Sequence, residues 1–141
     1  MIQCFLVNIG LDARILLAED NADFRSSFAS ALEEVLIPEG LEVVFVEVGT
    51  LTEARARLRE GGLDAALIDV GMPDGDGLDL VREIHDGGMG RPIPTMVLTA
   101  SLDTNMAIRA MELGGRGALS KLASMPEATE TIKVLTQARP S

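Results

Sequence analysis

The chain has 141 residues, 47% of them hydrophobic, and a formal net charge of −10, so we expect one folded domain and exclude a disordered chain. Aromatic residues make up only 3%, with no Trp and no Tyr, and the acidic charge repels phosphate backbones, which argues against direct binding of nucleic acid by this domain. The single Cys4 and the single His85 exclude an internal disulfide and a zinc site, and they favour a reducing, cytoplasmic setting.

Apolar runs and turn residues alternate along the chain. Residues 1–13 are apolar but lack the basic start of a signal peptide and the length of a membrane span, so we interpret them as a leader and expect no membrane association. The predicted strands are residues 14–20, 41–48, 65–69, 93–99 and 118–120. The predicted helices begin at Asn21 or Ala22, at Thr50, at Asp76 or Gly77, at Asp103 or Thr104, and near Pro126. In the fourth helix, the residues expected to face inward are Met106, Ile108, Met111 and Leu113.

This order, a strand followed by a helix five times over, predicts a parallel sheet. Right-handed crossovers then place helices on both faces of the sheet. We therefore expect an α/β fold, a flavodoxin-like (βα)5 doubly wound parallel sheet with strand order 2-1-3-4-5. The domain should span residues 14–138, and residues 139–141 should begin a linker or be an artificial chain end.

Polar side chains follow four of the predicted strands. Glu19 and Asp20 end the first strand, Asp69 ends the third, Thr99 ends the fourth, and Lys121 follows the fifth. In an open α/β sheet, ligands bind outside the carboxyl ends of the strands, so these groups should share one crevice. Two carboxylates about 4 Å apart repel by roughly 4 kcal/mol at an effective dielectric constant near 20, and a hard divalent ion such as Mg²⁺ relieves that repulsion.

These residues, in this order and at this spacing, resemble the receiver domain of two-component response regulators. Met72, Pro73 and Gly77 match the turn that follows the phosphorylated aspartate in that family. The resemblance covers most of the chain and implies a phosphoryl-accepting signalling domain rather than an enzyme. It also implies that a sensor histidine kinase donates the phosphoryl group, and that the altered surface changes an output such as transcription or the formation of a homodimer.

The resemblance assigns a role to each of the polar residues at the strand ends. Asp69 is the implied phosphorylation site, Thr99 the switch hydroxyl and Lys121 the lysine that contacts the phosphoryl group. Mg²⁺ is the implied cofactor, bound by Asp20, Asp69 and the backbone carbonyl of Gly71, with Glu19 acting through a water molecule. A phosphoryl group would then be surrounded by a metal ion, an ammonium group and a hydroxyl.

Three positions depart from the usual pattern of the family. Ala118 stands where many members have an aromatic switch residue, and Leu122 stands where many have a proline, so no cis proline bond is expected there. Glu19 stands in place of the commoner Asp. Ala118 and Leu122 leave an alternative open, namely a pseudo-receiver that binds partner proteins without being phosphorylated.

The stretch of residues 121–128 resembles the receivers of LuxR/NarL-type transcriptional regulators, whose effector is a helix-turn-helix DNA-binding domain. We therefore expect contact with DNA only through such a further domain. Two other classes of protein, a phosphatase and a flavin-binding protein, fit the sequence less well than a receiver domain does. A haloacid dehalogenase-type phosphatase needs a second Asp where this chain has Gly71, and a flavodoxin needs aromatic side chains to stack on its flavin.

Overall fold

The computed structural model describes residues 12–101 and 103–137. Its main sheet contains five parallel strands, which are β1 (Ala13–Ala18), β2 (Val43–Val48), β3 (Ala65–Asp69), β6 (Thr95–Thr99) and β7 (Ala118–Ser120). Their spatial order is β2-β1-β3-β6-β7. Since β6 and β7 are the fourth and fifth strands of this sheet, the predicted flavodoxin-like order 2-1-3-4-5 is confirmed.

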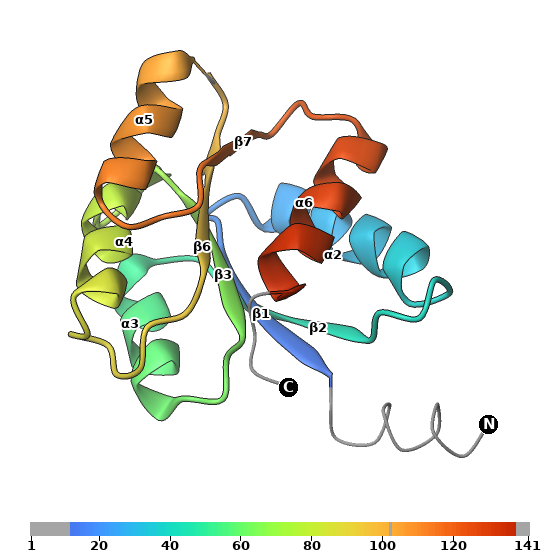
Figure 1. Ribbon diagram of the computed structural model, residues 1–141, viewed down its shortest axis with the longest axis horizontal. Coiled ribbons are helices and arrows are strands. Elements are labelled where there is room, and N and C mark those ends of the chain that lie inside the picture. The colour runs from blue at the N-terminus through green and yellow to red at the C-terminus, as the bar shows by residue number, and fades with distance from the viewer. Residues whose placement is uncertain (1–11, 102, 138–141) are drawn as a thin grey trace.

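Helices cover both faces of the sheet (Figure 1). On one face lie α3 (Leu51–Glu60), α4 (Gly77–His85) and α5 (Thr104–Glu112), and on the other lie α2 (Ala22–Leu36) and α6 (Met125–Gln137). Alternate residues of each strand point to opposite faces, so β1 sends Leu16 to one core and Ile15 to the other. The molecule therefore has three layers, with two apolar cores separated by the sheet.

Side-chain caps fix the starts of four helices. Asn21, Thr50, Asp76 and Asp103 each accept a hydrogen bond from a backbone N–H in the first turn of the helix that follows. These caps satisfy N–H groups that have no partner inside the helix, and they confirm the predicted helix starts. At the other end of α3, Gly61 has a φ of 81°, a conformation that favours glycine.

The prediction that Ile108 and Met111 face inward is wrong. Their side chains are 47% and 60% exposed, whereas Ala110 of the same helix is fully buried. At 3.6 residues per turn, Met106, Ala110 and Leu113 share one face, and Met106 and Leu113 pack partly buried against the core. Ile108 and Met111 are rotated away from that face, so α5 presents an apolar surface to solvent.

A short hairpin directly after β3 was not predicted. β4 (Gly71–Met72) pairs antiparallel with β5 (Gly75–Asp76), because the chain folds back on itself after Asp69. The loop closes where the N–H of Gly77 donates to the carbonyl of Val70 at 3.0 Å. A Cβ atom on Gly77 would lie 2.1 Å from the backbone oxygen of Asp69, so only glycine fits there. The loop is thus packed tightly against the strand end that carries Asp69.

Two predictions concern the ends of the chain. Of the leader predicted for residues 1–13, residues 1–11 lie outside the described residues, and Ala13 is the first, buried residue of β1. The predicted linker at residues 139–141 also lies outside them. Within the described ranges, none of the helices combines the length and the apolar character that crossing a membrane requires.

Candidate functional site

Three carboxylates meet at the carboxyl edge of the sheet. Glu19 and Asp20 follow β1, and Asp69 is the last residue of β3, the neighbouring parallel strand. Their oxygen atoms include a set, one from each residue, that lies within a mutual distance of 4.8 Å. Glu19 and Asp69 are buried while Asp20 is exposed, so the cluster opens to solvent on the side of Asp20. The structure therefore brings together the three acidic residues that were predicted to bind metal.

Lys121 brings one positive charge to this cluster. Its Nζ lies 2.5 Å from Oε1 of Glu19 and also forms an ion pair with Asp69. The residue follows β7, and its backbone N–H donates to the carbonyl of Thr99 at 2.9 Å, which fixes its place beside β6. Lys121 thus bridges the two buried carboxylates, as its position at a strand end predicted.

An aromatic contact supports the ammonium group from the side of α2. Nζ of Lys121 lies 5.3 Å from the centre of the Phe24 ring, and Phe24 in turn stacks on Phe28 at 5.3 Å between ring centres. A cation near an aromatic face is attracted by the ring, by about 0.5–2 kcal/mol. The sequence carried no signal for this contact, because Phe24 and Lys121 are far apart in the chain and Phe24 reads only as an apolar helix residue.

The electrostatics of the cluster leave an excess of negative charge. Burial raises the pKa of Glu19, and the hydrogen bond with Asp69 raises it further, against the opposing effect of Lys121. For Lys121, burial lowers the pKa, but its bonds to Asp69 and Glu19 outweigh burial, so the pKa is raised and the ammonium stays charged. One ammonium group therefore faces three carboxyl groups.

The residues of the cluster fit a magnesium ion. Its three acidic side chains offer carboxylate oxygens, which hard divalent cations prefer. Oε1 of Glu19 is buried and pairs with Lys121, which also pairs with Asp69, so one ammonium group is shared between two carboxylates. Carboxylates that share a single positive charge still repel one another, and a divalent cation would relieve that repulsion.

Thr99 and Gly71 border the cluster. Thr99 is buried at the end of β6, whose Leu98 pairs with Asp69, and its Oγ1 accepts a hydrogen bond from the N–H of Ser101 at 3.2 Å. A hydroxyl that accepts one bond still has its own proton to donate. The N–H of Gly71 donates to Oδ1 of Asp69 at 2.9 Å, so the turn after β3 lies directly against the carboxylate. Both residues lie where the sequence predicted them.

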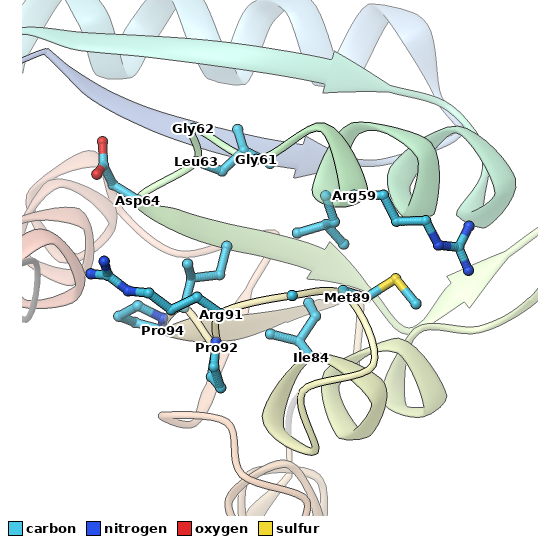
Figure 2. Close-up of a pocket in the computed structure, with 13 residues that line it drawn as sticks. Arg59, Gly61, Gly62, Leu63, Asp64, Ile84, Met89, Arg91, Pro92 and Pro94 are labelled. Carbon is cyan, nitrogen blue, oxygen red and sulfur yellow. The ribbon is translucent and has the colours of Figure 1, made fainter.

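A separate pocket of about 400 Å³ lies at the opposite edge of the sheet (Figure 2). Asp64 and Pro94, which precede β3 and β6, line it, whereas Asp69 ends β3 roughly 16 Å further along the strand. Figure 2 shows the side chains of Arg59 and Arg91 pointing in opposite directions, so their charges do not converge on one position. This pocket has no part in the chemistry of the acidic cluster.

Comparison with known proteins identifies the family. The family described as "Response regulator receiver domain" matches residues 15–133. The transcriptional regulatory protein UhpA of Salmonella typhimurium is 34% identical over 113 residues, which are 80% of this chain and 53% of that protein. The chain spans about half the length of the curated relatives that it matches.

Solved structures show the same fold. The signal receiver domain of a DNA-binding response regulator from Colwellia psychrerythraea 34H matches with a TM-score of 0.78 at 23% identity, over 89% of this chain and 99% of that one. A two-component response regulator of the LuxR family from Aurantimonas sp. SI85-9A1 matches with a TM-score of 0.75 at 25% identity, over 91% of this chain and 87% of that one. The family match covers most of the chain and includes all the residues of the acidic cluster, and the chain therefore belongs to the response regulator receiver domains.

Proposed function

We propose that Asp69 accepts a phosphoryl group from a sensor histidine kinase in the cytoplasm, with Mg²⁺ as cofactor. One observation carries the proposal. At the carboxyl edge of the sheet, Lys121 bridges Glu19 and Asp69, and Asp20 lies within reach of both. This arrangement combines a carboxylate nucleophile, a lysine that can follow the phosphoryl group, and oxygen ligands for a divalent cation.

The transfer would proceed by attack of an Asp69 oxygen on phosphorus. The new O–P bond forms as the P–N bond of the donor phosphohistidine breaks, and the imidazole keeps that electron pair. Asp20, Asp69 and the carbonyl of Gly71 would hold Mg²⁺, with Glu19 acting through a water molecule. The ion would supply positive charge that neutralises the phosphoryl oxygens. Lys121 would exchange part of its contact with Asp69 for a phosphoryl oxygen, as a compact point charge.

The switch would begin at Thr99. Its hydroxyl accepts a bond from Ser101, so its proton is available for a phosphoryl oxygen on the neighbouring strand. Movement of Thr99 would then alter the surface of α5 and β7. Ala118 on β7 has no side-chain rotamer to change, so the coupling would pass through the backbone and through α5 rather than through a rotating aromatic ring.

The output is proposed to be transcription. UhpA is named a transcriptional regulatory protein, and this chain matches about half of its length. We propose that DNA contact belongs to a further domain, because the net charge of −10 makes this domain a poor ligand for a phosphate backbone. Phosphorylation would control that output by changing the contacts of the receiver surface. The formation of a homodimer is one such change.

The test is the intact mass of the protein after incubation with acetyl phosphate, with and without Mg²⁺. We expect one added phosphoryl group on the wild type in the presence of Mg²⁺ and none on Asp69→Asn. Asp79→Asn is the matched control, because it makes the same chemical change at an acidic residue in the first turn of α4, outside the cluster. Phosphorylation of Asp69→Asn at the rate of the wild type would refute the assignment.

A second candidate function is a pseudo-receiver, which Ala118 and the 87% exposed Leu122 favour. Such a domain would bind its partner without being phosphorylated. It predicts that the wild type gains no phosphoryl group from acetyl phosphate or from a kinase, and that Asp69→Asn binds the partner as the wild type does. The measured mass therefore separates the two functions.

A further inference from the structure

Asp74 makes three hydrogen bonds to the start of α3. Its Oδ1 accepts from the backbone N–H of Leu51 at 2.8 Å, and its Oδ2 accepts from the N–H of Thr52 at 3.0 Å and from the hydroxyl of Thr52 at 2.9 Å. These bonds lower the pKa of Asp74, chiefly through the N–H of Leu51. Asp74 therefore stays ionised and caps a helix that begins more than twenty residues before it in the chain.

The same residue lies at the tip of the hairpin that follows Asp69. Asp74 connects β4 to β5, and the base of this hairpin is closed beside Asp69 by Gly71 and Gly77. Near the tip, a Cβ atom on Gly75 would lie 2.9 Å from Cδ1 of Leu51, so the hairpin also packs closely on α3. The loop is thus held at two points, at Asp69 and at α3.

We propose that Asp74 is a positioning residue for the metal and phosphoryl site. By fixing the hairpin to the start of α3, it holds the backbone of Gly71 in place against Asp69. This inference rests on the proposed function, because it concerns the carbonyl of Gly71 as a ligand of Mg²⁺. Residues that orient metal ligands without binding the metal themselves typically lower the metal affinity 10- to 100-fold when they are mutated.

The experiment compares Mg²⁺ binding by calorimetric titration in the full chain and three variants. We expect Asp74→Ala to raise the dissociation constant of Mg²⁺ about tenfold. Thr50→Ala is the matched control, because it removes the other side-chain cap of α3, the bond from the N–H of Glu53 at 3.0 Å, without touching the hairpin. Both variants should unfold at a lower temperature without Mg²⁺, but only Asp74→Ala should lose Mg²⁺ affinity.

Asp74→Asn distinguishes position from charge, because it removes the same negative charge as Asp74→Ala but keeps an oxygen acceptor for α3. We expect its Mg²⁺ affinity to lie between those of the wild type and Asp74→Ala, because one of the two oxygen acceptors for α3 is kept. The proposal is overturned if Asp74→Asn binds Mg²⁺ as weakly as Asp74→Ala, if Thr50→Ala is equally weak, or if Asp74→Ala binds as the wild type does. Failure of the wild type itself to bind Mg²⁺ would overturn the proposed metal site, and this inference with it.

Discussion

At the scale of single residues, Lys121 and a divalent cation would both neutralise the negative charge of the acidic cluster. The ammonium group pairs with Glu19 and Asp69, and both carboxylates are buried. A side chain without charge at this position would leave them without a cation, at a cost of about 1–3 kcal/mol in the free energy of unfolding. Lys121 therefore stabilises the domain in the absence of metal and lowers its need for one.

Lys121→Met should consequently lower the melting temperature without Mg²⁺ and increase the stabilisation that added Mg²⁺ provides. Binding to the folded state alone raises stability, and the ion would no longer share the carboxylates with an ammonium group. Thermal unfolding with and without Mg²⁺ measures both effects. Lys133→Met is the control, since Lys133 pairs with Glu39 at the surface, on α6. Equal Mg²⁺-induced shifts in Lys121→Met and the wild type would contradict the argument.

The lifetime of the phosphoryl group should depend on two small residues. Gly71 and Ser101 are both exposed beside the cluster, and a Cβ atom on Gly71 would approach no heavy atom more closely than Oδ1 of Asp69, at 3.9 Å. Asp69 itself is buried, but these two neighbours place no bulky side chain over a phosphoryl group that would extend from it, so we expect fast loss of that group. Gly71→Met and Ser101→Leu should slow that loss, measured as the decay of the phosphorylated mass. Ser30→Leu on the exposed side of α2 is the control. Unchanged decay of the phosphorylated mass in both Gly71→Met and Ser101→Leu would contradict the prediction.

At the scale of elements, an ion pair joins α3 to α4. Nε of Arg55 bonds to Oε1 of Glu83, and the second guanidinium nitrogen bonds to Oε2, each at 2.9 Å. The bond from Arg55 lowers the pKa of Glu83 below its ordinary value of 4.5. A carboxylate with a lowered pKa contributes stability that is present above pH 4.5 and is lost as the pH falls through its pKa in the folded state.

Glu83→Gln should therefore be less stable than the wild type at pH 7, by about 0.5–1 kcal/mol because the pair is about a third exposed. The difference should vanish at acidic pH, where Glu83 of the wild type is protonated. Urea unfolding at both pH values measures it. Glu60→Gln is the control, since its pair with Arg57 is more exposed and spans 3.9 Å. A difference that persists unchanged in acid would show that the ion pair is not its cause.

The elements also show which parts of the structure the sequence could predict. Strands and helix starts were predictable because apolar runs end in polar residues and because caps such as Thr50 precede each helix. The hairpin of β4 and β5 was not, since strands of two residues have no period to detect. The exposed face of α5 was not predicted, because apolar residues lie on both faces of this short helix and their type does not tell which face the core covers.

The same division holds for the site. Glu19, Asp69 and Lys121 were predictable because the carboxyl ends of parallel strands meet at one edge. Asp74 and Phe24 act through partners that are distant in the chain, and neither residue type carries a signal for such a partner. Sequence thus predicts the groups that strand ends deliver, while the contacts that hold those groups in place require the folded structure.

At the scale of the whole molecule, α5 presents an exposed apolar surface. Ile108 and Met111 are 47% and 60% exposed, and the neighbouring Ala118 on β7 is half-buried. The net charge of −10 makes two molecules of this protein repel each other. If the homodimer proposed above forms, burial of this apolar surface has to outweigh the charge repulsion, so we expect α5 and β7 to form its interface.

Met111→Lys should abolish that dimer, because an ammonium group would have to leave water to enter an apolar interface. Its free energy of unfolding should change by less than about 0.5 kcal/mol, since the side chain is exposed in the monomer. Val134→Lys on α6 is the control, because it makes the same change in net charge at a residue that is 50% exposed on the other face of the sheet. Sedimentation velocity after treatment with acetyl phosphate and Mg²⁺ measures the mass of the complex. If phosphorylated Met111→Lys dimerises as the wild type does, the interface lies elsewhere, and α5 is not the surface through which phosphorylation is read out.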